Sequence, residues 1–151
     1  MSDKIKKVLV PVDFTLRVHE NIDYAVWLAE NLNVKLFFLN VINTSVIESP
    51  KKIHLMSKSE AEHRLREKAK KKFEILIKEH ELDKYDIEIL IESGKPAKKI
   101  VEVANKIGAD LIVTRSCGRR GLMHFIFGST SEQVVRMADC PILVLKYKKK
   151  F

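Results

Sequence analysis

Two kinds of segment alternate along the 151-residue chain. Five short apolar runs are rich in branched residues, and most lack the polar and apolar alternation of a strand with one face in water. Each has the length of a strand, so the pattern predicts five strands that are buried on both faces. The runs are Val8–Val12, Lys35–Ile42, Ile87–Ile91, Asp110–Thr114 and Ile142–Leu145.

The segments between these runs have the period of an amphipathic helix. The apolar stripes of the first two predicted helices are Ile22, Ala25, Val26, Ala29 and Leu32, then Ala61, Leu65, Ala69, Phe73, Leu76 and Ile77. The stripes of the last two are Ala97, Ile100, Val101, Ala104 and Ile107, then Val134, Val135 and Ala138. We expect the face of the second helix that carries Arg64, Arg66, Lys68, Lys70, Lys71 and Lys72 to lie in water.

Proline and glycine residues indicate where the later helices begin and end. Pro96 suits the first position of a helix, and Gly108 suits the left-handed residue that follows a helix. The last helix begins near Ser129, and Pro141 restarts an extended chain.

Strands that are buried on both faces and separated by helices indicate a parallel sheet with right-handed crossovers. We therefore predict one α/β domain with a doubly wound, Rossmann-like, five-stranded parallel sheet, in the order 3-2-1-4-5 typical of this class. The long connection from Asn43 to Ser57, which contains Pro50, has the length of a functional flap.

Composition narrows the class of protein. Apolar residues make up 46% of the chain and charged residues 32%, with five glycines and four prolines, as in a globular protein. No apolar run has the length of a membrane span or a signal peptide, so we expect a cytoplasmic protein. There, Cys117 and Cys140 are expected to be free thiols.

The net charge of +8 is concentrated at the end of the chain. Lys146, Lys148, Lys149 and Lys150 lie within the last six residues, and without them the body carries only +4. That is a weak electrostatic signal for a dedicated nucleic-acid-binding protein.

The fold class places any ligand at the carboxyl ends of the strands, where the winding direction reverses. The predicted ends are Pro11, Val12 and Asp13 after the first strand, and Thr114 to Gly118 after the fourth. A carboxylate at Asp13 suits a ribose hydroxyl or a base amino group, which are hydrogen-bond donors. The simpler alternative is that Asp13 forms a turn or caps a helix.

The segment after the fourth strand concentrates glycine and arginine. Three of the five glycines, Gly118, Gly121 and Gly128, fall within eleven residues, and Gly128-Ser129 opens the last helix. Backbone N–H groups at a helix N-terminus bind anions, and Arg119 and Arg120 could add charge-assisted bonds to phosphate. The alternative is that these glycines only form turns and that Ser129 with Glu132 is an ordinary capping box.

Six short motifs are spread along the chain: Val8-Leu9-Val10-Pro11-Val12-Asp13-Phe14, Gly94-Lys95-Pro96, Ala109-Asp110-Leu111-Ile112-Val113, Gly118-Arg119-Arg120-Gly121, Gly128-Ser129-Thr130-Ser131-Glu132 and Cys140-Pro141-Ile142-Leu143-Val144. Through these motifs the chain resembles the universal stress proteins over nearly its whole length. The resemblance implies a universal stress protein domain over residues 1–146, of the adenine nucleotide alpha hydrolase-like type, followed by a basic tail over residues 147–151.

The resemblance also implies a nucleotide site. Nucleotide-binding members have a glycine, two residues, a second glycine, nine residues, and then glycine with serine or threonine. Gly118, the nine residues 119–127 and Gly128-Ser129 match this pattern, but Arg115 replaces the first glycine. An arginine there could fill part of the cleft or contact phosphate itself.

By the same resemblance the ligand is ATP or a related adenine nucleotide, with Mg²⁺ held mainly by the phosphates. Adenine would lie against Val41, the ribose and base would contact Asp13, and the phosphates would lie on Gly118 and Gly128–Thr130. The full predicted set is Pro11, Val12, Asp13, Val41, Thr114, Arg115, Gly118, Arg119, Arg120, Gly121, Gly128, Ser129 and Thr130.

The first functional hypothesis is thus a stress-response regulatory homodimer that binds an adenine nucleotide and pairs through strand 141–145. The alternative is a dimeric interaction protein of the same family that binds no ATP because of Arg115. Nucleic-acid binding through the basic helix and lysine tail is a third, weaker hypothesis. No catalytic motif is present, and His124 and Cys117 are expected to be spectators, so we do not expect an enzyme.

Overall fold

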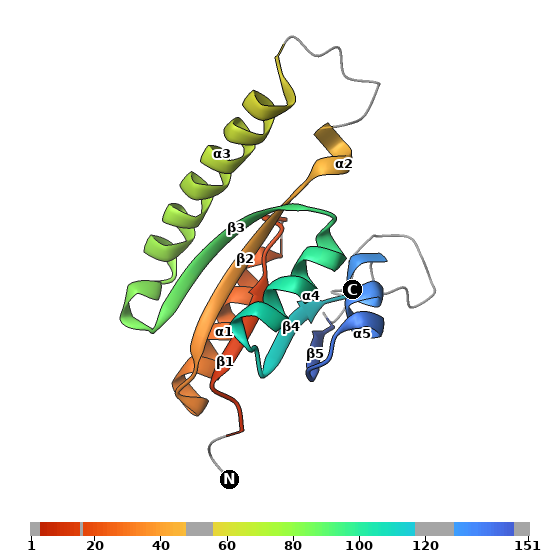
Figure 1. The fold of residues 1–151 in the computed structure, drawn as a ribbon. Coiled ribbons are helices and arrows are strands. Elements are labelled where there is room, and N and C mark those ends of the chain that lie inside the picture. Colours follow the sequence, from red (N-terminus) through yellow and green to blue (C-terminus); the bar gives the residue numbers. More distant parts are fainter. Residues whose placement is uncertain (1–3, 16, 48–55, 117–128, 147–151) are drawn as a thin grey trace, which may run out of the picture.

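A five-stranded sheet runs through the computed structural model, which describes residues 4–15, 17–47, 56–116 and 129–146 (Figure 1). Every neighbouring pair of strands is parallel, and the order is β3-β2-β1-β4-β5. This confirms the predicted doubly wound fold and its strand order. The strands are β1 (Lys7–Pro11), β2 (Lys35–Asn43), β3 (Ile87–Gly94), β4 (Leu111–Arg115) and β5 (Ile142–Leu145).

The helices include the four that the hydrophobic period predicts and two short additions. They are α1 (Val18–Leu32), α2 (Thr44–Ile47), α3 (Lys58–Glu79), the 3-10 turn η1 (Leu82–Lys84), α4 (Pro96–Ile107) and α5 (Ser129–Met137). The predicted connection from Asn43 to Ser57 therefore begins with a helical turn, and its residues 48–55 lie outside the described part of the chain. Within the described ranges, no helix is both long and apolar enough to cross a bilayer.

Successive residues of a strand face opposite sides of the sheet, so the core has two layers. On one side Val8 and Val10 pack with residues of α1 and α3, such as Ile22 and Phe73. On the other side Leu9 packs with residues of α4 and α5. Because both layers exclude water, the strands carry the continuous apolar runs from which they were predicted.

The ends of α4 follow from single residues. Pro96 occupies the first turn, and Gly108 ends the helix in the left-handed region with φ +67°. Both are as predicted. Ser57 caps α3, because its hydroxyl accepts a hydrogen bond from the Glu60 N–H at 3.2 Å.

Three residues that were assigned to apolar stripes are exposed. Leu32 is the last residue of α1 and is 43% exposed, and Val135 is 46% exposed because it points one-quarter turn away from the buried Val134. Leu65 is 38% exposed, since the first turns of α3 project past the sheet (Figure 1). For these residues the predicted burial is wrong.

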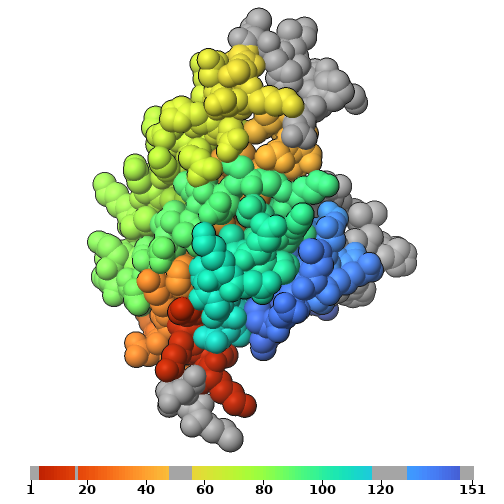
Figure 2. All heavy atoms as spheres, viewed as in Figure 1, coloured from red at the N-terminus to blue at the C-terminus, as the bar shows by residue number. Residues whose placement is uncertain are grey.

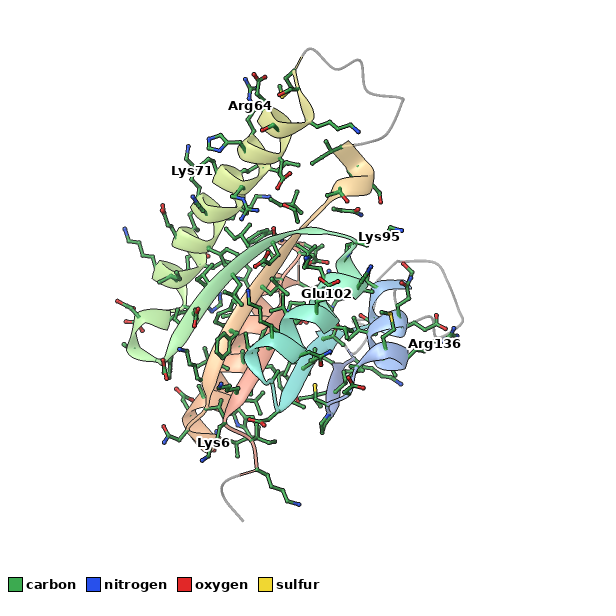
Figure 3. All side chains as sticks on the ribbon, viewed as in Figure 1. Lys6, Arg64, Lys71, Lys95, Glu102 and Arg136 are labelled. Atoms are coloured by element: carbon green, nitrogen blue, oxygen red, sulfur yellow. The ribbon has the colours of Figure 1, made fainter. Side chains whose placement is uncertain are left out.

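The basic face of α3 is only partly solvated. Arg64 and Lys71 point away from the sheet (Figure 3). Arg66 instead donates to the Ile91 carbonyl at 2.6 Å and to the Ser93 hydroxyl at 3.3 Å. Since β3 is an edge strand, this arginine covers backbone that would otherwise be left open to other chains.

Candidate functional site

The ends of β1 and β4 meet through an ion pair. Arg115, the last residue of β4, places its Nη2 atom 2.6 Å from Oδ2 of Asp13, which follows β1. These two predicted site residues are 102 positions apart in the sequence, and the strand order makes them neighbours. The Arg115 side chain is 16% exposed and that of Asp13 is 58% exposed.

The Arg115 backbone is regular strand. It pairs in register with Leu145 of β5, so its conformation is extended and none of the strain that a positive φ would impose is present. The arginine at this position therefore affects the site through its side chain rather than through its backbone.

A network of backbone contacts fixes Asp13. Its Oδ1 accepts a hydrogen bond from the Thr15 N–H at 3.2 Å, so the predicted alternative, a turn-forming aspartate, describes part of what it does. Just before it, the Val12 carbonyl accepts from the Asn40 amide at 2.8 Å. Phe14 follows with φ +57°, a left-handed conformation that is rare for an aromatic residue and is maintained by surrounding contacts.

The Arg115 end of the site rests on α5. The Ser131 hydroxyl is buried, donates to the Arg115 carbonyl at 2.6 Å, and lies 3.0 Å from the Thr114 hydroxyl. Ser131 and Asn40 were both missed by the sequence analysis. The sequence feature that could have indicated Ser131 is that it is the third consecutive hydroxyl residue at the start of a helix that must pack on a strand.

Beside these residues a hollow of about 240 Å³ opens between the end of β2 and α3. It contains Val41, against which the family resemblance places adenine. Figure 2 shows that α2, in orange, lies next to the first turns of α3, in yellow. The lining residues are Phe14, Asn40, Val41, Ile42, Asn43, Val46, Leu65, Lys68, Ala69 and Lys72.

Aromatic and cationic contacts shape this hollow. The Phe14 ring packs edge-on against Phe73, with centroids 4.8 Å apart, and Lys72 Nζ lies 5.2 Å from the Phe14 centroid. Two lysines of the basic face, Lys68 and Lys72, thus border an apolar pocket instead of only facing solvent.

Of the remaining predicted residues, some are described by the structure and the others lie outside the described ranges. Pro11 ends β1, Val12 is buried behind it, and Ser129 and Thr130 begin α5. Glu132 accepts a hydrogen bond from Arg136 at 2.7 Å, which gives its carboxylate a partner other than the proposed capping box. Gly118, Arg119, Arg120, Gly121 and Gly128 lie outside the described residues, as do Cys117 and His124.

The described site combines positive charge with one carboxylate. Arg115 pairs with the carboxylate of Asp13, and Lys68 and Lys72 add positive charge at the hollow between β2 and α3. In the described ranges, the histidine and carboxylate cluster with metal-ligand spacing lies elsewhere, between α1 and α3. The arrangement can therefore accept an anion and hydrogen-bond donors around an apolar slot.

Comparison with known proteins extends this picture. The sequence model described as "Universal stress protein family" matches residues 4–146. Universal stress protein MJ0531 of Methanocaldococcus jannaschii is 32% identical over 151 residues, covering 96% of this chain and 84% of that protein. Universal stress protein MJ0577 of the same organism is 28% identical over 160 residues, covering 98% of this chain and 99% of that protein.

Solved structures agree with the fold. A structure of MJ0577 matches with a TM-score of 0.80 at 28% identity, covering 97% of this chain and 99% of that one. A universal stress protein crystallised in complex with cAMP matches with a TM-score of 0.64 at 21% identity, covering 93% of this chain and 96% of that one. The family model that matches residues 4–146 and the relative that is 32% identical over 96% of the chain show that the chain belongs to the universal stress protein family.

Proposed function

We propose that the chain is a stress-response regulatory protein that binds ATP or a related adenine nucleotide at the carboxyl ends of β1, β2 and β4. The observation that carries this proposal is the Asp13–Arg115 ion pair beside the hollow at Val41. It joins a carboxylate, a cation and an apolar slot in one place. The proposed activity is binding and not catalysis.

Asp13 keeps the capacity to bind a ribose. Each carboxylate oxygen has about two acceptor positions, and each has one donor here, Thr15 N–H on Oδ1 and Arg115 on Oδ2. With 58% of the side chain exposed, the free positions face solvent. Ribose hydroxyls can therefore donate to Asp13 while Arg115 stays in place.

The hollow suits a base better than a whole nucleotide. Its volume of about 240 Å³ is below the roughly 300–1,000 Å³ of pockets that enclose drug-sized ligands. Phe14 and Leu65 offer apolar surface, and Asn40 and Asn43 offer polar groups at the edge, while the Val41 side chain packs in the layer of α4 and α5. We place adenine here, with the sugar and phosphates outside it.

Arg115 would favour the phosphates by compensating Asp13. A bare carboxylate repels a nucleotide anion, whereas the adjacent guanidinium cancels that charge. The phosphates would extend towards Ser129 and Thr130 at the start of α5, where backbone N–H groups and the helix dipole favour anions. The predicted contacts at Gly118, Arg119, Arg120, Gly121 and Gly128, with Mg²⁺ on the phosphates, complete this proposal.

The fold is compatible with such a ligand. The universal stress protein solved in complex with cAMP shows that a protein of this fold can hold an adenine nucleotide. For the present chain, cytoplasmic localisation remains the expectation from the sequence.

Isothermal titration of the full chain with Mg·ATP tests the proposal. We expect saturable heat for the wild type and about tenfold weaker binding for Arg115→Gly, which leaves Asp13 uncompensated. Arg136→Met is the matched control, because Arg136 pairs with Glu132 on α5 and leaves Asp13 untouched. Equal loss in this control would contradict the role given to Arg115.

The alternative is a family member that binds no ATP, and the same ion pair favours it, since the guanidinium already occupies one oxygen of Asp13. In that case the wild type shows no heat and Arg115→Gly gains binding. Nucleotide binding would be rejected altogether if neither the wild type nor Arg115→Gly gave heat and if the denatured protein released no nucleotide.

The homodimer is proposed to form through residues 141–145. β5 is the last strand of the sheet, and within the described chain its outer edge has no neighbouring strand. An unpaired apolar edge favours pairing with a second copy. Light scattering after size exclusion tests this: Val144→Lys is expected to give monomers, whereas the exposed helix variant Val135→Lys is expected to remain dimeric.

A further inference from the structure

Two histidines and a glutamate meet on the face of the sheet that is covered by α1 and α3. His19 lies in the first turn of α1, and Glu79 and His80 lie at the end of α3. One ligand atom from each of the three residues lies within 4.8 Å of the others. The nucleotide site uses none of these side chains.

The histidine nitrogens face each other directly. Nδ1 of His19 is 2.8 Å from Nε2 of His80, and Oε2 of Glu79 is 3.9 Å from the same His19 nitrogen. Two neutral imidazoles can make this contact only when one proton lies between the nitrogens. Without this proton, both nitrogens would direct a lone pair into the same space.

A carboxylate behind His80 prepares it as a ligand. Oδ1 of Asp23 lies 3.2 Å from Nδ1 of His80, so a neutral His80 carries its proton on Nδ1 and leaves the Nε2 lone pair directed at His19. A carboxylate that holds the far nitrogen of a histidine is the usual support of a metal-ligating imidazole.

We propose that His19, Glu79 and His80 bind a divalent transition-metal ion of the zinc class, with a water molecule in the fourth position. Two imidazoles and one carboxylate are the donor set that Zn²⁺ accepts with tetrahedral geometry. Mg²⁺ and Ca²⁺ prefer sites made of oxygen atoms, so the two nitrogens select against them. The ion replaces the proton that His19 and His80 share.

The required movement is small and is available. Tetrahedral bonds of about 2.0–2.1 Å to zinc separate two nitrogens by roughly 3.4 Å, so the two nitrogens must part by about half an ångström and the rings must turn until both lone pairs point at the ion. The His80 side chain is 14% exposed and is fixed, whereas those of His19 and Glu79 are 54% and 52% exposed and are free to adjust. The bound ion would join the first turn of α1 to the end of α3, the helix whose other half borders the Val41 hollow.

Zinc titration of the full chain, after treatment with a chelator, tests the site. We expect one equivalent to bind and to raise the unfolding midpoint by about 5–10 °C at a metal concentration near 100 times Kd. The variant H19Q/H80Q should bind more than about 100-fold more weakly and should lose the shift. Acidification should weaken binding in the wild type, because imidazoles must be neutral to bind metal.

His63→Gln is the matched control, since His63 is an exposed histidine on α3 that lies outside the cluster. It should bind zinc as the wild type does. Unchanged zinc binding in H19Q/H80Q, or an equal loss in His63→Gln, would overturn the proposal, as would the absence of binding in the wild type.

A second variant distinguishes a loss of zinc binding from a loss of folding. Asp23→Asn keeps all three ligands and the exposed surface of α1, and it should weaken zinc binding about 10–100-fold by loosening His80. Co²⁺ in place of zinc should give the visible absorption of a four-coordinate site without a thiolate charge-transfer band. A thiolate band would assign the metal to cysteine and would refute the site.

Discussion

Arg115 and Asp13 form an ion pair, with 2.6 Å between Nη2 and Oδ2, across the two strands at which the winding of the sheet reverses. Reversal of the winding leaves the ends of β1 and β4 without a covering crossover helix between them, which is why ligands bind there in open α/β sheets. In this chain a salt bridge links the two ends. Any ligand at this point must bind beside that pair or exchange with it.

The ion pair should contribute measurably to stability. Asp13→Asn keeps an oxygen for the Thr15 N–H but removes the charge, so it leaves the largely buried guanidinium of Arg115 without its carboxylate. A double-mutant cycle with Arg115→Met in urea is expected to give a coupling free energy of about 1 kcal/mol. Strictly additive effects would mean that the contact is too solvent-screened to matter.

Ser131 of α5 forms hydrogen bonds with the same end of β4. In Ser131→Ala the Thr114 hydroxyl and the Arg115 carbonyl lose their shared partner, and the unfolding free energy should fall by about 1–3 kcal/mol. Ser129→Ala, at the exposed first position of α5, should change it by less than about 0.5 kcal/mol.

Thr114→Val provides the complementary measurement for this hydroxyl pair. If the cost of Ser131→Ala comes from the orphaned Thr114 hydroxyl, then combining both substitutions should recover part of the loss. A double variant that is as unstable as the sum of the two would place the cost on the Arg115 carbonyl alone.

A structural feature is easiest to predict from the sequence when its cause lies in one or a few neighbouring residues. Pro96 and Gly108 act on their own backbone, so the limits of α4 follow from two residues. The alternation of buried strands and helices predicts a parallel sheet, whereas the strand order was expected from the fold class, because periodicity does not give the neighbours of a strand. Leu65 was placed wrongly because periodicity gives a stripe but not how far a helix extends beyond its sheet, and Val135 because the stripe was drawn too wide around the buried Val134.

The site is less predictable, because its partners are set by register. Asp13 and Thr114 were expected at one edge, yet the pairing of Arg115 with Asp13 depends on the side-chain conformation of one arginine. Asn40 and Ser131 look like ordinary polar residues until β2 and α5 are packed next to β1 and β4. His19 and His80, 61 positions apart, meet only when α1 and α3 cover the same face.

Gly108 offers a test of the local rule. Its φ of +67° is in the left-handed region, and a Cβ added there would meet nothing within 4 Å. Gly108→Ala should therefore cost only the backbone term, about 1 kcal/mol, and Gly108→Asn should cost less, because asparagine tolerates this conformation. Urea unfolding measures both, and equal costs for alanine and asparagine would contradict a purely conformational origin.

The amino ends of β1 and β4 are also joined by an aspartate, and this contact makes stability depend on pH. Oδ2 of Asp110 accepts hydrogen bonds from the backbone N–H groups of Lys6 and Lys7, both at 2.9 Å, and these bonds lower the pKa of Asp110 below its ordinary value of 3.8. A depressed pKa in the folded state means that unfolding takes up protons at low pH. The contribution of Asp110 to stability is therefore complete above pH 3.8 and is lost as the pH falls through the lower folded-state pKa.

Asp110→Asn isolates that charge, because the amide oxygen can still accept both N–H groups. The variant should be less stable than the wild type by about 1 kcal/mol at pH 7, and the difference should shrink towards zero under acid conditions. Asp110→Ala, which removes the acceptor as well, should remain less stable at every pH. Urea unfolding of the three proteins at a series of pH values measures this. A difference between wild type and Asp110→Asn that grows on acidification would have the wrong sign for a carboxylate stabilised by backbone N–H groups, and would show that the strand starts are held by some other contact.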